Sequence, residues 1–509
     1  MFDQSRSQRA VSPRATRRLR MEDCIVVDKQ ELRKAQIGAG VGNFIEWYDI
    51  GIYGYLAVTM TSVFTEGMDA RMGLLVTLLG FAVSFVVRPL GGMILGPLGD
   101  RIGRRRVLFF TMAIMAAATT IIGLLPTAGQ VGLWVIIPLY LLKMLQGFST
   151  GGEYSGAATY IAEFSPDRGR GFMTSLLNSG SMLGFAAGAS VVAVTTMVTT
   201  SLWGESAMLD GGWRIPFLIA LPLGIVAIVL RRRIPESPSF EAAHVKTASD
   251  DVDPIFVRHN LRNIMKHYWP QILIGCAVVA ADGTSGYMLT SYMPTFLETQ
   301  VGSNAVHTAV AAVIVLVLQA LLIPVVARWS DRIGRRPIYA MATIGNLVLL
   351  VPAFALMHVG ALWSLYLALF LVSLPSAFFL SLTGAVMSEL FPTASRYGCV
   401  GVTHNLSISI FGGTTPLVSQ ILVEVTGNAY APAFYVMFFS AVALVALLKM
   451  RESASRPLLG SVPVVSSHDE AAMLVEGQDT NDRLDLRTML LTPEPAEAAR
   501  ADSVGAGAR

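Results

Sequence analysis

The chain of 509 residues is 53% hydrophobic and only 14% charged. A soluble domain carries about a quarter charged residues, so this composition excludes an ordinary soluble protein and indicates one that is buried in lipid. The formal net charge of +3 excludes little, because the positions of the charges decide how a membrane protein is oriented. The three cysteines lie far apart in the chain, which predicts free thiols and no metal site.

The first 36 residues are basic and polar, and they lack the small-residue cleavage pattern of a signal peptide. We therefore expect residues 1–36 to remain as an N-terminal segment. The first hydrophobic helix then serves as the uncleaved insertion signal.

Twelve stretches are long and apolar enough to cross a bilayer, which takes about 20 residues. Six precede a polar interval and six follow it. The predicted spans are 38–62, 73–97, 107–126, 133–160, 171–198, 213–230, 269–297, 305–328, 337–357, 361–388, 398–424 and 430–450. The sequence therefore predicts an all-α membrane protein of twelve transmembrane helices.

Positive charge in the loops predicts the orientation. The loops after the even-numbered spans are rich in arginine, whereas the opposite loops are mostly acidic and hold only Arg71 and Arg214. Because arginine-rich loops stay in the cytoplasm, both termini are predicted to be cytoplasmic. The predicted domains are a cytoplasmic segment 1–36, a six-helix bundle 37–230, a cytoplasmic central loop 231–268, a second six-helix bundle 269–450, and a largely disordered cytoplasmic tail 451–509.

Two motifs occur once in each half of the chain. The motif D-R-I-G-R-R stands at 100–105 and again at 331–336, each time between the second and third spans of its half. Glu163, Pro166 and Arg170 recur as Glu389, Pro392 and Arg396, after the fourth span of each half. Two repeats at matching places predict two pseudo-symmetric six-helix bundles, an arrangement typical of one large class of secondary transporters.

The arginine-rich loops are predicted to act as gates. Their candidate gating residues are Asp100, Arg101, Gly103, Arg104, Asp331, Arg332, Gly334 and Arg335. Arginines in such a short turn can pair with acidic groups at helix ends and latch the halves together. The alternative is that they only obey the positive-inside rule; the recurrence of Asp and Gly at fixed places favours the latch.

Further motifs carry a family resemblance. They are E-W-Y-D at 46–49, R-P-L-G-G at 88–92, Q-G-F-S-T-G-G-E-Y at 146–154, W-R-I-P-F at 213–217 and Y-M-P at 292–294. With D-R-x-G-R-R, the loop signature of the major facilitator superfamily, they resemble its metabolite:proton symporter family and, within it, the proline/betaine transporters. The resemblance implies alternating access by two rocking six-helix halves around a midplane site.

The resemblance runs from about residue 31 to 475, including R-P-L and Gly460 in the early tail, and two features depart from it. Some osmosensing members end in a long heptad-patterned helix, whereas this tail has no sustained heptads. Asp282 in the seventh span and His404 in the eleventh are also unusual for the family pattern.

Ionisable groups inside the membrane mark the candidate site. Each costs roughly 2.5–3.5 kcal/mol on insertion scales and usually persists only where it functions or is paired. With the aromatic residues beside them, the candidate substrate-binding or proton-coupling residues are Glu46, Trp47, Tyr48, Asp49, Arg88, Lys143, Glu153 and Asp282.

These candidates suggest a division of roles. Carboxylates in a low-dielectric site have raised pKa values, so Glu46, Asp49 or Glu153 can take up and release a proton. Arg88 or Lys143 can hold the carboxylate of a solute, and Trp47 and Tyr48 can face an ammonium group through cation–π attraction. The alternative is that the two bases only neutralise the acids in fixed pairs between helices; for the set as a whole, a functional cavity is favoured.

The charge balance bears on the solute. Four acids and two bases within the spans suit a zwitterion such as proline or glycine betaine, with one carboxylate left for a proton. The alternative is an organic acid such as 2-oxoglutarate, citrate or a shikimate-like compound. Whether the coupling ion is a proton or sodium stays open at this point.

Other classes of protein are excluded by missing motifs. The sequence has no Gly-Lys pair, hence no Walker A loop, and no H-E-x-x-H motif. We therefore expect no enzyme, no cofactor and no nucleic-acid partner. The expected partners are a small solute, a coupling ion and membrane lipid.

Overall fold

The computed structural model describes residues 18–102, 104–151, 153–232, 261–486 and 489. The central loop predicted at 231–268 lies mostly outside these residues. So do the side chains of Asp100, Arg101, Gly103 and Arg104, the gating residues predicted in the first half.

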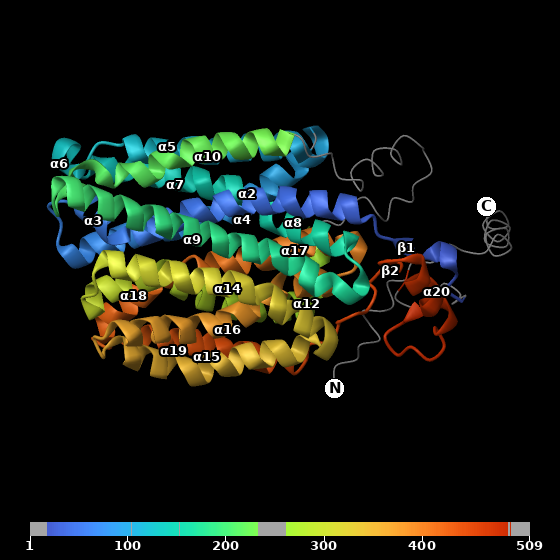
Figure 1. Ribbon diagram of the computed structural model, residues 1–509. Helices are drawn as coiled ribbons and strands as arrows, with labels where there is room; N and C mark the ends of the chain where they lie inside the picture. Colours follow the sequence, from blue (N-terminus) through green and yellow to red (C-terminus); the bar gives the residue numbers. More distant parts are fainter. Residues whose placement is uncertain (1–17, 103, 152, 233–260, 487–488, 490–509) are drawn as a thin grey trace.

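The N-terminal half crosses the bundle six times (Figure 1). Its helices are α2 (Lys29–Tyr55) with α3 (Ala57–Phe64), α4 (Ala70–Ile102), α5 (Arg104–Leu124), α6 (Ala128–Val131) with the 3-10 turn η2 (Gly132–Val135), α7 (Ile136–Thr150) and α8 (Glu153–Phe164), the turn η3 (Asp167–Gly169) with α9 (Arg170–Trp203), and the π-turn η4 (Met208–Gly212) with α10 (Arg214–Arg232).

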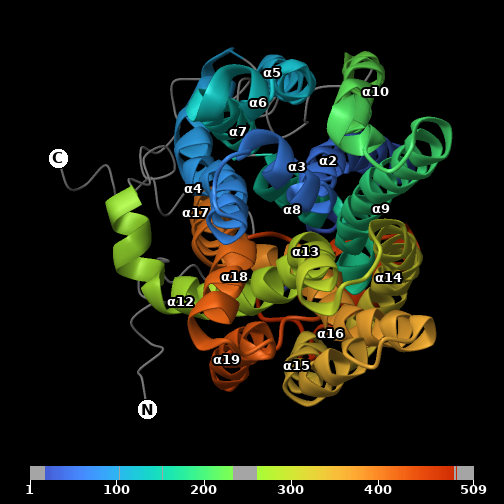
Figure 2. The same cartoon turned by 90° about the vertical axis from the view of Figure 1, so that its left-hand side faces the viewer.

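The C-terminal half repeats this pattern. Its helices are α12 (Leu261–Tyr287) with η6 (Met288–Tyr292), α13 (Met293–Phe296) and η7 (Leu297–Val301), then α14 (Ala305–Ile333), α15 (Arg335–Met357), α16 (Leu362–Glu389), α17 (Thr393–Ser407) with η8 (Ile408–Gly412) and α18 (Thr415–Thr426), and α19 (Ala431–Leu447). Figure 2 views the bundle end-on, with the two halves on opposite sides of a shared interface.

Among the described residues, nine helical segments are long and apolar enough to cross a membrane by themselves. The apolar parts of the third and twelfth crossings, Phe109–Leu124 and Ala431–Leu447, are shorter. The first crossing carries the polar residues Asn43, Glu46 and Asp49, all buried, which lower its hydropathy. Together these segments make twelve crossings, and the predicted twelve-helix all-α membrane fold is confirmed.

Glycine permits the closest helix contacts in the N-terminal half. A Cβ atom on Gly147 would meet the carbonyl group of Ser84, and one on Gly151 would meet that of Arg88, so α7 lies directly against α4. At Gly156 an added Cβ would have ordinary contact distances. Small residues let membrane helices approach closely without a hydrophobic driving force, and the fourth span packs in this way at Gly147 and Gly151.

The halves meet along two long helices and at the chain ends. The helix α14 packs along α9, and its start is fixed by Asn304, whose side chain accepts a hydrogen bond from the Val306 backbone N–H. At one end of the bundle the strand β1 (Ile25–Val26) pairs in parallel with β2 (Val464–Val465), next to α20 (His468–Glu476).

The prediction that residues 451–509 form a largely disordered tail is therefore wrong for residues 451–486. This part of the tail contains one strand and one helix. The polar composition of this segment suggested disorder. Composition could not reveal its contacts, because the groups that it contacts lie in loops far away in the sequence.

Candidate functional site

Two opposite charges lie at the centre of the bundle. The Arg88 guanidinium on α4 is 3.1 Å from the Glu46 carboxylate on α2, and the two side chains are 7% and 1% exposed. The guanidinium also lies 4.1 Å from the centre of the Phe85 ring and 6.0 Å from that of Trp47. Arg88 therefore already has an anionic partner, which a solute carboxylate would have to share or displace.

Aromatic rings from both halves surround this pair. Trp47 lies 5.2 Å from Phe185 and 5.9 Å from Tyr287 on α12, measured between ring centres. Tyr287 also meets Phe85 edge-on at 5.0 Å. The Tyr287 hydroxyl is buried and has no hydrogen-bond partner among the described residues. A cationic or polar group placed here would face several π surfaces.

Tyr287 was missed by the sequence reasoning, although a signal existed. The pair Gly54-Tyr55 in the first span recurs as Gly286-Tyr287 in the seventh. Both tyrosine hydroxyls are buried without a hydrogen-bond partner among the described residues. The two tyrosines are therefore counterparts in the two halves of the repeat.

The C-terminal half contributes a carboxylate. Asp282 on α12 is 4% exposed. Its Oδ2 atom accepts a hydrogen bond of 2.6 Å from the Thr383 hydroxyl, and its Oδ1 atom has no hydrogen-bond partner among the described residues. The hydroxyls of Tyr154 and Tyr287 lie within electrostatic range of Asp282 and also of Glu46. Asp282 therefore belongs to the same cluster as the Arg88–Glu46 pair.

His404 and Tyr154 complete the cluster from α17 and α8. Their rings stack at 4.5 Å, and the Tyr154 hydroxyl donates to Asn178 at 2.8 Å. His404 is buried, and its Nδ1 atom has no hydrogen-bond partner among the described residues. These residues were not among the predicted site residues, because a lone histidine or tyrosine in an apolar helix usually packs as a neutral core residue.

Asp49 and Lys143 form a second buried group within the N-terminal half. Asp49 accepts hydrogen bonds from Thr119 at 2.6 Å and Gln146 at 3.0 Å. The Lys143 ammonium lies 4.1 Å from the centre of the Tyr53 ring and within electrostatic range of Asp49. These two predicted residues thus lie together.

Tyr48 and Glu153 lie elsewhere. The Tyr48 hydroxyl donates to the Pro216 carbonyl on α10 at 3.1 Å, so Tyr48 packs inside the N-terminal half. A role of Tyr48 in facing an ammonium group stays a prediction. Glu153 is half-buried at the first residue of α8, two turns beyond Gln146 along the fourth span.

The central cluster is closed toward the end opposite the chain termini. Arg71, next to the start of α4, lies 3.6 Å from Glu424 on α18. Deeper in the bundle, a Cβ atom on Gly54 would lie 3.3 Å from the Ser291 backbone, so the first and seventh spans touch there. Both contacts join one half to the other.

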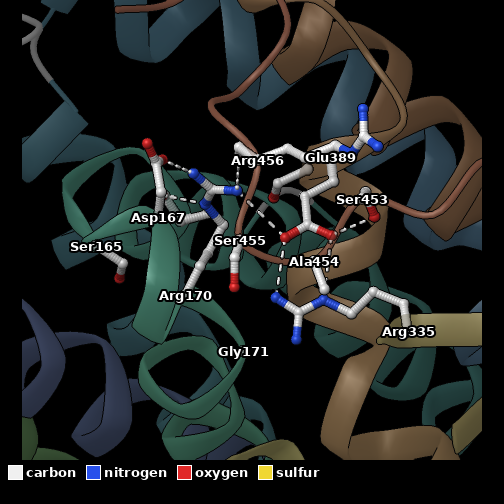
Figure 3. Close-up of polar contacts among 12 residues, drawn as sticks. Ser165, Asp167, Arg170, Gly171, Arg335, Glu389, Ser453, Ala454, Ser455 and Arg456 are labelled. Atoms are coloured by element: carbon white, nitrogen blue, oxygen red, sulfur yellow. Dashed lines mark hydrogen bonds and ion pairs between the residues drawn. The ribbon is translucent and has the colours of Figure 1, made fainter. Parts of the chain in front are cut away.

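The second loop motif closes the end that holds the termini. Asp331 accepts hydrogen bonds of 2.9 Å from the backbone N–H groups of Gly171 and Phe172, at the first turn of α9 in the other half. A carboxylate in that position is favoured by the helix dipole. Arg335 pairs with Asp331 at 2.8 Å. It also pairs with Glu389 at 3.0 Å (Figure 3).

The remaining residues of this loop have different surroundings. Gly334 has a φ of 113° and lies so close to the Glu452 carboxylate that a Cβ atom would clash with it. Glycine is therefore required there for both the backbone conformation and the space. Arg332 is exposed, and nothing in the structure gives it a role in closing the bundle.

The repeated Glu and Arg residues pair across the halves. Arg170 of the N-terminal half lies 3.2 Å from Glu389 of the C-terminal half, and Arg396 lies 2.8 Å from Glu163 in the reverse sense. Arg170 also contacts Asp167. Together with Asp331 and Arg335 these residues form a cluster that we call the latch. In this pseudo-symmetric arrangement, the arginine of each repeat pairs with the glutamate of the other repeat.

The tail binds directly to the latch (Figure 3). The Glu452 carboxylate accepts hydrogen bonds from the backbone N–H groups of Arg335 and Arg336, at 2.8 and 3.1 Å. Ser453 donates to Glu389 at 2.6 Å, and Arg170 donates to the Arg456 carbonyl at 3.1 Å. Sequence reasoning noticed the family-like R-P-L segment here but did not assign it a contact.

Comparison with known proteins places these features in a family. The family described as "Sugar (and other) transporter" matches residues 35–461. The ectoine/proline transporter ProP of Corynebacterium glutamicum is 52% identical over 96% of both chains. The glycine betaine/proline/ectoine/pipecolic acid transporter OusA of Dickeya dadantii is 36% identical over 94% of both, and the proline/betaine transporter of Escherichia coli is 37% identical over 90% of this chain and 91% of its own.

Solved structures share the fold at low sequence identity. The proton:xylose symporter XylE, of the major facilitator superfamily, superposes with a TM-score of 0.66 at 16% identity, covering 84% of this chain and 98% of its own. The inward-open form of XylE from E. coli gives a TM-score of 0.61 at 16% identity, covering 83% and 97% of the two chains. At this identity the likeness supports the fold alone.

Proposed function

Because the chain belongs to the sugar (and other) transporter family of the major facilitator superfamily, we propose that it is a symporter that imports a small zwitterionic osmolyte together with a proton. Proline, glycine betaine and ectoine are the solutes to test first, since relatives at 36–52% identity are named for them. The arginine-rich loops support cytoplasmic termini, and the bacterial relatives support a position in the inner membrane.

One observation carries the proposal of a zwitterion. The central cluster contains one guanidinium, Arg88, two carboxylates, Glu46 and Asp282, and the rings of Trp47 and Tyr287. A zwitterion offers a carboxylate to Arg88 and a positive nitrogen to the carboxylates and the rings. The ligand then brings as much positive as negative charge into a dry site.

An organic acid with two or three carboxylates fits this cluster less well. It would bring further negative charge beside Glu46 and Asp282, and burying uncompensated charge is costly. Among the described residues, the other buried base near the centre is Lys143, which lies with Asp49 in the separate N-terminal group. The charge balance therefore favours a zwitterion over 2-oxoglutarate or citrate.

The contacts at both ends support an alternating-access cycle. Arg71 and Glu424 join the halves at one end, and the latch joins them at the other. The solute reaches the cluster when the first set of contacts separates, and it leaves toward the cytoplasm when the latch separates. The structure thus represents a closed intermediate of such a cycle.

Uptake into proteoliposomes tests the proposal. We expect saturable uptake of labelled glycine betaine, proline or ectoine when the outside is made acidic, and loss of accumulation when a proton uncoupler is added. A sodium gradient at equal pH serves as the control for the coupling ion. Accumulation driven only by sodium would refute the proton, and uptake of dicarboxylates without any of the three zwitterions would refute the solute class.

A further inference from the structure

We propose that Asp282 carries the coupled proton and that Thr383 and Tyr339 link its protonation to the latch. The inference rests on the proton coupling proposed above. Each cycle forms one O–H bond on Asp282 with a proton from water on the outer side. The same bond breaks when the proton passes to water on the latch side, so one positive charge crosses with each solute.

Among the central carboxylates, Asp282 is the one whose negative charge is least balanced by hydrogen-bond donors and cations close to it. Glu46 lies 3.1 Å from Arg88, and Asp49 accepts hydrogen bonds from two side chains. Asp282 accepts one, from Thr383, and no cation of the described residues lies at ion-pair distance from it. Burying an ionised carboxylate without a partner costs several kcal/mol, and protonation removes this cost.

The hydrogen bonding of Thr383 suits both states of Asp282. Its hydroxyl oxygen lies 2.6 Å from Asp282 Oδ2 and 3.0 Å from the Phe379 carbonyl oxygen, but the hydroxyl has one hydrogen to donate. When Asp282 is ionised, Thr383 donates to it. When Asp282 is protonated, its own O–H can donate to Thr383, which then donates to Phe379. The change requires rotation of one hydroxyl and no movement of heavy atoms.

The neutral groups that face Asp282 come from three helices. They are the hydroxyls of Tyr154 on α8, Tyr287 on α12 and Tyr339 on α15, all buried. Tyrosine is neutral at physiological pH. From α17, His404 stacks on Tyr154. The charged neighbours in the cluster are Arg88 and Glu46, which act on the same Tyr287 and form an ion pair with each other. The net charge at this position therefore changes with Asp282 and with a solute bound beside it.

Thr383 and Tyr339 extend toward the latch. On α16, Thr383 precedes Glu389 by six residues, about 9 Å along the helix. On α15, Tyr339 follows Arg335 by one turn. The Tyr339 hydroxyl lies within hydrogen-bonding reach of Thr383 and within electrostatic range of both Asp282 and Arg335. It can donate a hydrogen bond toward Asp282 and accept one from the side of Arg335.

This arrangement makes Tyr339 a positioning residue. When Asp282 loses its proton, the new negative charge attracts the Tyr339 hydroxyl and the Arg335 guanidinium behind it. Arg335 is then drawn away from Glu389 and Asp331. Through these two carboxylates the C-terminal half contacts the N-terminal half. Loss of the proton and separation of the latch therefore favour each other.

The first test replaces Asp282 and compares two kinds of transport. We expect Asp282→Asn to lose at least nine-tenths of the accumulation driven by a proton gradient. Its exchange of labelled for unlabelled solute, measured at saturating solute because the lost carboxylate weakens binding, should no longer depend on pH. Asp282→Glu should keep gradient-driven accumulation. Exchange by Asp282→Asn also shows that the variant is folded.

Two results would overturn the inference and remain distinguishable. If wild type responds to the proton gradient and Asp282→Asn accumulates solute equally well, Asp282 does not carry the proton, although the proposed function stands. If wild type itself ignores the proton gradient, the proposed function fails, and the role of Asp282 fails with it.

The second test concerns the path to the latch. We expect Thr383→Val and Tyr339→Phe to move the midpoint of the pH profile of uptake by half a unit or more, while Thr383→Ser keeps the wild-type profile. A merely structural role would lower the maximal rate at every pH by the same factor. A uniform loss of rate with an unchanged midpoint in both variants would refute the link.

Discussion

The latch offers a comparison between two glutamates that the sequence repeat makes equivalent. Glu389 is 2% exposed and binds Arg170 and Arg335, whereas Glu163 is 29% exposed and binds Arg396 alone. Removing one partner of a buried pair costs about 3 kcal/mol or more, because it leaves the other charge unpaired. For a pair that is partly open to water the cost is closer to 1 kcal/mol.

The free-energy cost of an unpaired arginine applies to the closed state alone. Once the latch separates, the arginines are solvated by water and need no carboxylate partner. Glu389→Gln should therefore lower the ratio of latched to open molecules by about a hundredfold, at 1.36 kcal/mol for each factor of ten. Glu163→Gln should lower it by about fivefold. The difference follows from burial and from the number of partners, because the chemical change is the same.

Spin labels on exposed residues at the latch end measure this ratio. Lys34 and Arg332, one in each half, can be replaced by cysteine for labelling in a variant that lacks the three native cysteines. We expect a second, longer distance to dominate in Glu389→Gln and to remain minor in Glu163→Gln. Equal distributions in the two variants, or a larger effect from Glu163, would refute the reasoning.

Three further results are expected. Gly147→Ala should lower the thermal unfolding temperature in detergent by several degrees, because its Cβ would meet the Ser84 carbonyl, while Gly156→Ala, with ordinary space, should leave it unchanged. Trp47→Ala should raise the KM for glycine betaine about tenfold and Trp47→Phe much less, since phenylalanine keeps a π face; equal KM values would count against an ammonium beside this ring. Glu452→Gln should weaken the latched state by about 1–2 kcal/mol by reducing two charged hydrogen bonds to α15, and an unchanged distance distribution between the labels described above would contradict this.

Much of the fold was predictable from the sequence, because hydrophobic length decides where a chain crosses a bilayer. Even the first crossing was identified, although Glu46 and Asp49 lower its hydropathy. The repeat also predicted that the motif at 331–336 lies at a contact between halves, as Asp331 and Arg335 do. Periodicity and repeats are properties of the chain itself and need no coordinates.

The candidate site was predictable only in part. Glu46, Arg88, Trp47 and Asp282 lie in one cluster, because a charge inside a membrane helix is costly wherever it does not function or find a partner. The sequence could not show which charges pair, since pairing depends on how the helices are rotated against one another.

Two groups of residues escaped the sequence reasoning for different reasons. Tyr287 and His404 are neutral and amphipathic, so nothing in an apolar span distinguishes them from packing residues. The tail that holds Glu452 has the polar composition of disordered segments, yet its main chain and carboxylate bind helix ends and side chains of the latch. Whether such a segment is ordered, or such a residue belongs to the site, depends on partners that are distant in the sequence.

Simultaneous measurement of solute and proton flux tests the central claim most directly. Proteoliposomes containing a pH-sensitive dye would receive glycine betaine, or proline or ectoine if these are the better solutes, with no ion gradient imposed. The account predicts acidification of the interior that saturates with solute, disappears with an uncoupler, and is absent in Asp282→Asn although solute still exchanges. Saturable solute entry in wild type without proton movement would contradict it.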